Sequence, residues 1–141
     1  MLLDANLLLY AGDRASPHHE QSADWLVRVL NGGRRVGIPW QTIGTYVRIA
    51  THPRIIDHPI TPAEAWIRVS GWLAADPTWV PPATERTAAV FGRLLEDAPA
   101  TGNLVPDLQL AALAVEHGLT VISADADFVR FPGVRWENPL V

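Results

Sequence analysis

Residues 120–128 read TVISADADF: an apolar run of strand character ends in a polar turn that holds two aspartates. The chain begins in a similar way, because residues 1–6 read MLLDAN. A turn after a strand needs only Gly, Asn or Ser, so a carboxylate after both strands points to a further role. In open α/β sheets, ligands bind outside the carboxyl ends of the strands. The two segments therefore predict a sheet with acidic side chains at its ligand-binding edge.

Between these two segments, short apolar runs alternate with stretches of helical spacing. About five strands alternating with helices predict an α/β fold, with a central, mainly parallel β-sheet flanked by α-helices. The length of 141 residues predicts a single domain over residues 1–141. We expect strands at Met1–Leu3, Arg35–Pro39, Thr78–Val80, Leu119–Ile122 and Val134–Trp136. We expect helices at Pro17–Leu30, Gln41–Ala50 and Thr61–Ala74, one after Thr84, and one from about Pro106 to Gly118.

Local sequence patterns mark the ends of several of these helices. Ser16 can cap a helix that has Pro17 at its first position. Thr61 and Glu64 have the spacing of a capping box, in which each side chain bonds the backbone N–H of the other residue. Gly118 fits the left-handed position that ends many helices.

The composition limits the kinds of function that are possible. All 11 lysine and arginine positions are arginine, so a mechanism that needs a lysine is excluded. The absence of cysteine excludes disulfides and thiolate metal sites, and it fits a cytoplasmic protein. The net charge of -4 is unusual for a protein that holds nucleic acid only by releasing counterions. We expect no membrane segment and no secretory signal, because no apolar run is long enough and Asp4 interrupts the start.

Four aspartates form the candidate site. Asp4 follows the first strand, Asp107 lies in the first turn of a helix, and Asp125 and Asp127 follow the strand at 119–122. If the first and fourth strands are neighbours, these carboxylates converge on one cleft. Clustered carboxylates repel each other unless a cation joins them, and Mg²⁺ or Mn²⁺ is the natural choice because both prefer oxygen ligands. Such an ion would also let an acidic cleft hold an anionic phosphate backbone.

Each acid also has a plain structural explanation. Asp4 can hydrogen-bond the backbone of its own turn, and residues 123–127 can form a capped turn. Asp107 can simply place a favourable negative charge at a helix N-terminus. The joint placement of the four acids on an α/β pattern is what favours a functional site.

Several other polar and aromatic residues are expected to be structural. His18 and His19 are neighbours on a helix and cannot face one ligand, so a solvated helix face is expected. Trp40 follows the second strand and could stack a nucleobase, but packing is the preferred interpretation. Packing in the core or against a partner is also expected of Trp25, Trp66 and Trp72.

Taken together, these motifs resemble those of the PIN-domain ribonuclease toxins of VapBC toxin–antitoxin modules. LLDAN at 2–6 is similar to the first-strand acid of that family. DLQLAALAVEHG at 107–118 is similar to its acidic helix motif, and VISADADF at 121–128 is similar to its acidic turn. IPWQTIGTYVRIATHPR at 38–54 resembles one branch of these toxins. The resemblance covers essentially the whole chain.

The resemblance implies a site, an activity and partners. Asp4, Asp107 and Asp125 would hold Mg²⁺ or Mn²⁺. Asp127 would be a further acid, and Ser123 would be the hydroxyl beside the metal site. The implied activity is metal-dependent endoribonuclease cleavage of structured RNA, commonly loops of tRNA or ribosomal RNA. The implied partner is a small VapB-type antitoxin that covers the cleft, and a homodimer is implied because many members form one.

The expected mechanism is hydrolysis by in-line attack of water on the scissile phosphate. Asp127 would orient the attacking water, and the products would carry a 5′-phosphate and a 3′-hydroxyl. Asn6 would fill the polar position that follows the first acid in the family. Candidates for contacts to the RNA backbone are Arg34, Arg35, Arg48, Arg54 and Arg130.

One position departs from the family pattern. The family usually has a Glu in the helix after the second strand, and the corresponding residue here is Thr45. No acid lies between Val36 and Ile56, so nothing nearby supplies the missing charge. We therefore expect one metal ion held by three aspartates, without support for a second metal site.

Three other functions are weighed against this one. A PIN fold with a weakened site could bind RNA or a protein without cutting, and metal-dependent turnover would separate that module from an enzyme. Phosphoryl transfer to an aspartate, as in receivers and haloacid-dehalogenase-like phosphatases, is disfavoured by the missing lysine. It is also disfavoured by Asn6, because the phosphatases need an acid there. A nucleotide-binding domain would need a glycine-rich phosphate loop, which this chain lacks.

Overall fold

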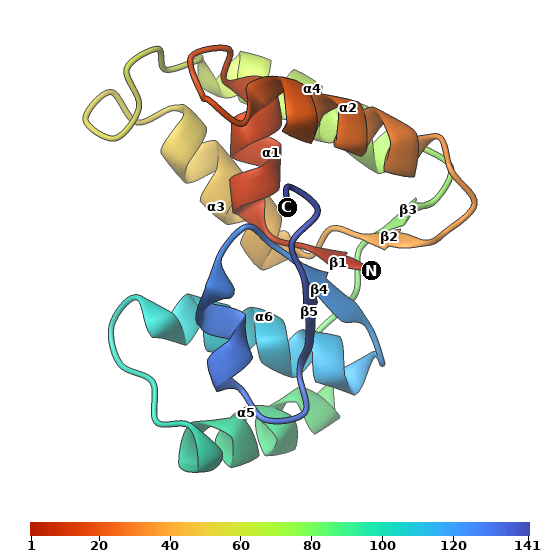
Figure 1. Cartoon of the computed structure of the whole chain (residues 1–141), viewed down its shortest axis with the longest axis vertical. Coiled ribbons are helices and arrows are strands. Elements are labelled where there is room, and N and C mark those ends of the chain that lie inside the picture. Colours follow the sequence, from red (N-terminus) through yellow and green to blue (C-terminus); the bar gives the residue numbers. More distant parts are fainter.

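The computed structural model describes residues 1–141 and is built around one five-stranded β-sheet (Figure 1). Neighbouring strands are parallel throughout, and they lie in the order β3-β2-β1-β4-β5. The strand bounds are Leu2–Leu3 (β1), Val36–Gly37 (β2), Thr78–Trp79 (β3), Thr120–Ile122 (β4) and Arg135–Glu137 (β5). The predicted α/β fold with a central parallel sheet between helices is confirmed.

Strand β1 lies at the centre of the sheet, between β2 and β4. The chain runs outward from β1 through β2 to β3, and then returns to the other side of β1 for β4 and β5. The strand order therefore reverses between β1 and β4, where α/β sheets of this kind bind ligands. Leu3 pairs with Ile122, so Asp4 and Ser123 leave the two strands side by side. The backbone N–H of Asp4 donates to the carbonyl of Ile122 at 3.0 Å.

Helices cover both faces of the sheet (Figure 1). On one face, α1 to α4 enclose a core that includes Leu3 and Tyr46. On the other face, α5, α6 and a 3₁₀ helix enclose a second core with Leu2 and Phe128. Leu2 and Leu3 enter opposite cores because successive side chains of a strand point to opposite faces. The helix bounds are Ala5–Gly12 (α1), His19–Leu30 (α2), Trp40–Ala50 (α3), Pro62–Ala74 (α4), Glu85–Asp97 (α5), Leu104–Glu116 (α6) and Ala126–Arg130 (the 3₁₀ helix, η1).

Helix α1 was not among the helices expected from the sequence. It begins directly after β1, and the Asp4 carboxylate caps it by accepting a hydrogen bond from the Ala5 N–H at 2.7 Å. Leu7 and Leu8 are fully buried in the first core. The continuous apolar run around Asp4 concealed the helical spacing, since a helix buried over much of its surface shows little periodicity.

Helix α2 begins at His19, two residues later than predicted from the pair Ser16 and Pro17. The Ser16 hydroxyl accepts from the N–H of His18 at 3.2 Å, and its carbonyl accepts from the N–H of His19 at 3.1 Å. Ser16 therefore closes a turn ahead of the helix and does not cap it. Both patterns use the same hydroxyl-to-backbone bond, which is why the sequence does not separate them.

Two predicted helix ends are confirmed. Thr61 and Glu64 form the capping box at the start of α4, with hydrogen bonds of 3.1 Å and 2.7 Å between side chain and backbone. Gly118 follows α6 with φ +65°, a conformation that favours glycine.

None of the helices combines the length and the apolar character that crossing a bilayer requires.

The tryptophans divide between core and surface. Trp25 lies in the first core, and Trp72 packs edge-on against Tyr46 with ring centroids 4.7 Å apart. Trp40 is 61% exposed and Trp66 is 52% exposed. The interpretation of Trp40 as a packing residue was therefore wrong. Its place at the start of α3 turns its ring away from the core, while Ile43 and Tyr46 on the same helix are buried.

Candidate functional site

The four aspartates lie where helices begin beside the ends of β1 and β4. Asp4 caps α1 and Asp125 caps η1, where its carboxylate accepts from the N–H of Asp127 at 2.9 Å. Asp107 lies in the first turn of α6, and Asp127 lies in the first turn of η1. Helix N-termini carry partial positive charge, which favours carboxylates at these positions. The local folding of the chain thus explains why each acid is tolerated there.

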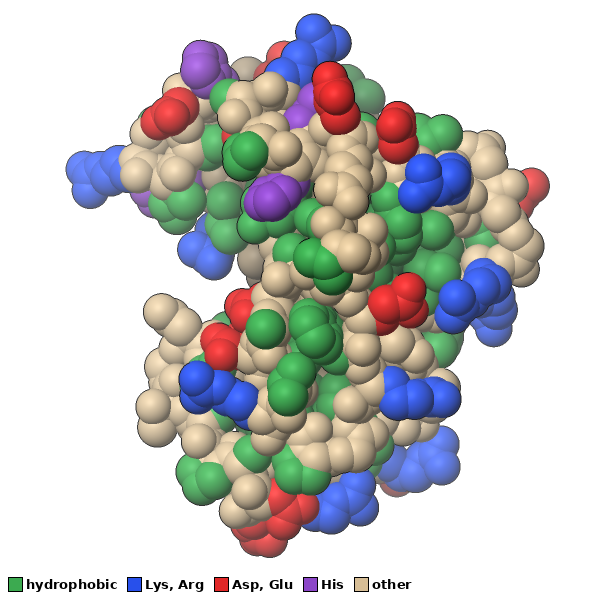
Figure 2. Space-filling model, in the orientation of Figure 1, with side chains coloured by type: hydrophobic (Ala, Val, Ile, Leu, Met, Phe, Trp, Pro, Cys, Tyr) green, Lys and Arg blue, Asp and Glu red, His purple; other side chains and the backbone are tan.

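The structure brings three of these acids into one group. Carboxylate oxygens of Asp107, Asp125 and Asp127 all lie within 4.8 Å of one another. The one ion pair of the structure joins Arg130 Nε to Asp127 Oδ1 at 3.0 Å on the same turn. Figure 2 shows acidic side chains gathered beside a hollow that separates the upper and lower parts of the molecule. The acids are therefore accessible from solvent and only partly neutralised.

Asp4 lies behind this group and is tightly held. Its Oδ2 accepts hydrogen bonds from Ser123 Oγ at 2.6 Å and from Asn6 Nδ2 at 3.0 Å, and its Oδ1 accepts from the Ala5 N–H at 2.7 Å. Asn6 Nδ2 also donates to Ser123 Oγ at 2.9 Å. Three donors on one carboxylate fix its orientation, and they favour its charged form.

Ser123 connects the two strand ends. Its side chain is fully buried, and besides bonding Asp4 its Oγ accepts from the N–H of Asp125 at 3.0 Å. Its carbonyl accepts from Trp136 Nε1 at 3.0 Å, which ties β5 to the same turn. All of the hydroxyl's bonding capacity is used within the protein. Ser123 therefore sets the position of Asp4 relative to Asp125.

Two carboxyl groups of this site, those of Asp4 and Asp107, have raised pKa values. Burial raises the pKa of Asp107 to about 7 from an ordinary 3.8, and the charges of Asp4, Asp125 and Asp127 act in the same direction. Burial also raises the pKa of Asp4, with a smaller contribution from Asp125. The hydrogen bonds from Ser123 and Ala5 oppose that rise. Such shifts show that negative charge is costly here without a cation.

A small pocket of about 80 Å³ opens in front of Asp4 and Asp107. Thr45 of α3 lines the same pocket, as expected for the position where a Glu is usual. The pocket has room for an ion and several waters but not for a nucleoside. Asp107 belongs both to this pocket and to the group with Asp125 and Asp127, so it joins the two halves of the site.

The predicted metal ligands are thus distributed over these two halves. Asp107 and Asp125 are within reach of a common ion. The third carboxylate of their group is that of Asp127 and not that of Asp4. The assignment of Asp4, Asp107 and Asp125 as ligands stays a prediction. The sequence did not single out Gln41, which lines the small pocket, or Trp136, which anchors the Ser123 turn. Neither belongs to a recognisable acidic motif.

Of the histidine and arginine candidates, only Arg130 contacts the acidic group, through Asp127. His19 Nδ1 is within 3.3 Å of the carbonyl of Tyr10, and His18 is exposed, so the histidines form no metal site. Arg35 packs over the ring of Trp79, with its Cζ 4.3 Å from the ring centroid. Arg130 is paired with Asp127. Arg48 is an exposed residue of α3, the helix that supplies Thr45.

The chemistry of the donor set suits a hard divalent cation. The group offers carboxylate oxygens and no sulfur or imidazole, which favours Mg²⁺ or Mn²⁺ over zinc or copper. The cavity size and the raised pKa values agree with this, because a cation would relieve the repulsion. A site of this kind can bind an anionic phosphate group and promote its hydrolysis.

Comparison with known proteins gives a consistent family. A family described as PIN domain matches residues 1–134. The chain is 42% identical to ribonuclease VapC37 of Mycobacterium tuberculosis, covering 98% of this chain and 96% of that protein. It is 34% identical to the VapC ribonuclease Mb2897 of Mycobacterium bovis, covering 99% of this chain and 95% of that protein.

Solved structures share the fold at low sequence identity. VapBC2 of Rickettsia felis, bound to a DNA fragment from its promoter, has a TM-score of 0.72 at 18% identity. The match covers 97% of this chain and 96% of the other. VapC20 of Mycobacterium tuberculosis, a toxin that cleaves the sarcin–ricin loop, has a TM-score of 0.68 at 14% identity. That match covers 95% of this chain and 98% of the other.

Proposed function

This chain belongs to the PIN-domain family, and from that premise we propose that it is a metal-dependent endoribonuclease, the toxin of a type II toxin–antitoxin module. The observation that carries the proposal is the convergence of Asp107, Asp125 and Asp127 at the strand reversal, with Asp4 held behind them. The ribonuclease names of relatives that match along the whole chain support the choice of RNA as substrate.

A divalent cation, Mg²⁺ or Mn²⁺, is part of this proposal. Asp107 and Asp125 would hold it, with Asp127 or Asp4 as the third carboxylate. When bound, such an ion supplies Lewis-acid activation of water and neutralises charge on the phosphoryl oxygens. One ion is the expectation, because Thr45 brings no carboxylate to the small pocket.

The chain's own residues orient the reaction. Ser123 and Asn6 hold the Asp4 carboxylate in place, and Ser123 also fixes the backbone of Asp125. Asp127 belongs to the same group, and its carboxylate would accept a hydrogen bond from the attacking water. In-line attack by water breaks the bond from phosphorus to the 3′-oxygen, which leaves a 5′-phosphate and a 3′-hydroxyl.

The RNA is proposed to be structured, with the cut in an accessible loop of tRNA or ribosomal RNA. The hollow beside the acidic side chains is open to solvent, so an accessible loop could approach it (Figure 2). Arg48 on α3 and Arg54 after it are exposed and carry no carboxylate partner, so they are candidates for backbone contacts. We also propose that two copies of this chain form a homodimer.

The proposed partner is a VapB-type antitoxin, and a groove at the other end of α1 suits it. The groove lies between α1, α2 and α4 and measures about 450 Å³. Val27 and Ile67, two of its lining residues, are 62% and 71% exposed. Arg14 and Arg68 also line it and have no carboxylate partner in this chain. An amphipathic segment with apolar and acidic side chains would fit this combination.

The test is cleavage of total bacterial RNA by the purified protein with Mg²⁺, Mn²⁺ or EDTA. An Asp107→Asn variant, prepared in the same way, keeps the shape of the side chain and removes one charge. Cleavage that needs the metal and disappears in the variant supports the proposal. Products that end in a 2′,3′-cyclic phosphate would contradict attack by water. If both proteins bind RNA but neither cuts it with any metal, the chain is a binding module with a weakened site.

A further inference from the structure

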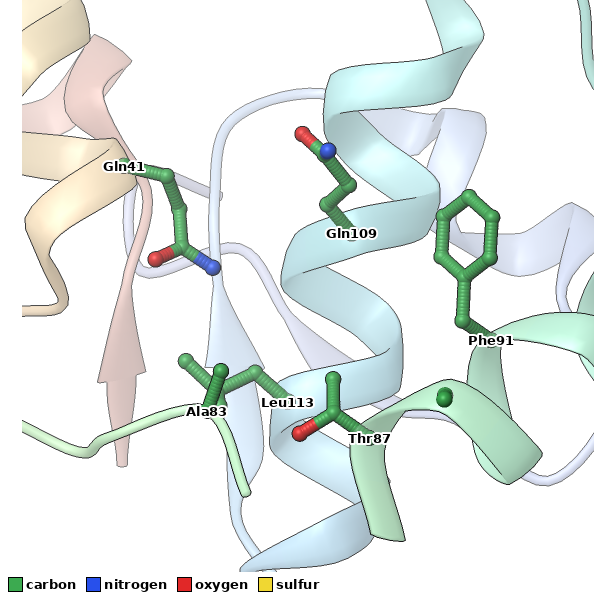
Figure 3. Close-up of a pocket in the computed structure, with 7 residues that line it drawn as sticks. Gln41, Ala83, Thr87, Phe91, Gln109 and Leu113 are labelled. Carbon is green, nitrogen blue, oxygen red and sulfur yellow. The ribbon is translucent and has the colours of Figure 1, made fainter. Parts of the chain in front are cut away.

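A second pocket, called the large pocket below, adjoins the acidic site and has no part in the activity proposed above. It measures about 390 Å³ and lies between the start of α3 and the helices α5 and α6 (Figure 3). Phe91 and Leu113 give it an apolar wall, with Ala83 and Ala88 at its edge. Its volume is within the range of pockets that bind small organic groups.

Gln41 connects this pocket to the acidic site. It lines the large pocket and also the small pocket in front of Asp4 and Asp107. An RNA strand with a phosphate at the acids therefore has the large pocket within reach of an adjacent nucleotide. The two pockets are neighbouring parts of one surface.

The lining of the large pocket suits a nucleobase better than a phosphate. No charged residue lines it. In Figure 3, the amide side chains of Gln41 and Gln109 extend from α3 and α6, and the Phe91 ring extends from α5. Neither amide has a hydrogen-bond partner within the protein, whereas the Thr87 hydroxyl is already bonded to Glu116. An amide offers a donor and an acceptor, which is what the edge of a base requires.

We propose that this pocket binds one unpaired nucleobase of the RNA substrate, at a nucleotide next to the cleaved phosphate. The base packs against Phe91, and the amides of Gln41 and Gln109 bond its edge. Cleavage then depends on base identity at that nucleotide, so the pocket is a specificity site. This inference rests on the ribonuclease function proposed above, and it assigns the base specificity of cleavage to Gln41, Phe91 and Gln109.

The test uses Gln109→Leu, which keeps the size of the side chain and removes its amide. Gln109 is exposed, so the change leaves folding intact, and thermal unfolding checks this. The matched control is Gln21→Leu on the exposed face of α2, far from the pocket. Cut sites in total bacterial RNA are mapped by sequencing the new 5′ ends. We expect Gln109→Leu to lose base preference at one position beside the cut, while the control keeps it.

A second arm uses a short RNA around the strongest mapped cut site. An abasic nucleotide replaces each neighbour of the cut in turn. At the contacted position we expect kcat/KM of the wild type to fall about tenfold, the size of one good base contact. The Gln109→Leu variant should be slow on the intact RNA and lose little more on the abasic one. Such non-additivity would not follow from a purely structural role of Gln109.

The outcomes separate the two proposals. If the wild type cleaves RNA but Gln109→Leu and the abasic RNAs change neither rate nor base preference, the nucleobase pocket is overturned and the ribonuclease stands. If the wild type does not cleave, both fall together. Sedimentation of the same proteins gives a third result. If Gln109→Leu dissociates a dimer and leaves base preference unchanged, the pocket is an interface between two copies, and the inference is overturned.

Discussion

Asp107 is the residue that joins the two halves of the acidic site. It faces Asp4 and Thr45 in the small pocket and Asp125 and Asp127 in the open group. Burial and these neighbouring charges raise its pKa to about 7, so near neutral pH the carboxyl is poised between its two states. A cation that binds there displaces the proton, because metal and proton compete for the same oxygens.

This electrostatic arrangement predicts an unusual pH dependence of stability in EDTA. Folded Asp107 keeps its proton up to a pH of about 7, whereas the unfolded chain loses it near 3.8. Between these values the folded state binds more protons, so the stability that this group contributes falls as the pH rises towards 7 and changes little above that. Thermal unfolding at several pH values should show a smaller decline in Asp107→Asn. An equal decline in both proteins would mean that the pKa of Asp107 is not raised in the folded state.

Ser123 predicts a different result, because it positions Asp4 and touches no substrate. In Ser123→Ala, Asp4 and Asn6 each lose a hydrogen bond, which costs about 1–3 kcal/mol of stability. The pKa of Asp4 should rise further, so the acid side of the pH–rate profile should move to higher pH. The matched control is Ser22→Ala, which removes a buried hydroxyl that has no hydrogen-bond partner. A profile that does not move in Ser123→Ala would exclude the positioning role.

Replacing Thr45 with an acidic residue should strengthen metal binding. In Thr45→Glu, a third carboxylate joins those of Asp4 and Asp107 in the small pocket, so Mn²⁺ should bind about tenfold more tightly, because ligand charge tunes affinity. In EDTA the same variant should unfold at a lower temperature near neutral pH, since the acids repel each other. Gly44→Glu adds the same charge to an exposed position on the same helix and serves as the control. Unchanged Mn²⁺ affinity in Thr45→Glu would mean that Thr45 is not at the metal site.

Among the helices and strands, elements with strong local patterns were predictable. The capping box of Thr61 and Glu64 begins α4 as expected, because both of its bonds are formed within one turn. Helix α1 was missed because Asp4 ends a strand and caps a helix at the same residue. The 3₁₀ helix at Ala126–Arg130 was expected only as a turn, since five residues are too few to show a period.

The composition of the site was more predictable than its geometry. Each acid follows a strand or opens a helix, and those local signs are present in the sequence. Which three acids lie closest together depends on how η1 places Asp127, and no local pattern specifies that. The same limit applies to Gln41 and Trp40, because their exposure depends on the way α3 packs.

In the whole molecule, the acidic site and the groove between α1, α2 and α4 use different surfaces. Helix α1 links them, because Asp4 caps its start and Gly12 lies at its end, where Arg68 Nη1 donates to the Gly12 carbonyl at 3.0 Å. If the antitoxin binds this groove, as proposed, it would inhibit cleavage only by extending from the groove over the acids. It does not need to replace any catalytic group.

This separation predicts a variant that cuts RNA but escapes inhibition. Ile67→Asp adds a charge to the exposed apolar lining of the groove and should weaken antitoxin binding at least tenfold without changing RNA cleavage. Ile55→Asp is the matched control, because Ile55 is also exposed but lies in the loop after α3. Calorimetry measures antitoxin binding by each variant, and an RNA cleavage assay on the same preparation measures its activity. Equal antitoxin affinity in both variants would place the partner elsewhere.

We propose that the grouped aspartates hold the ion needed for cleavage. Crystals grown with Mn²⁺, measured at a wavelength where manganese scatters anomalously, test it directly. We expect a peak about 2.0–2.4 Å from carboxylate oxygens of Asp107 and Asp125, and no such peak in Asp107→Asn. If the site holds no manganese at a Mn²⁺ concentration that supports cleavage, the proposed role of these aspartates is contradicted.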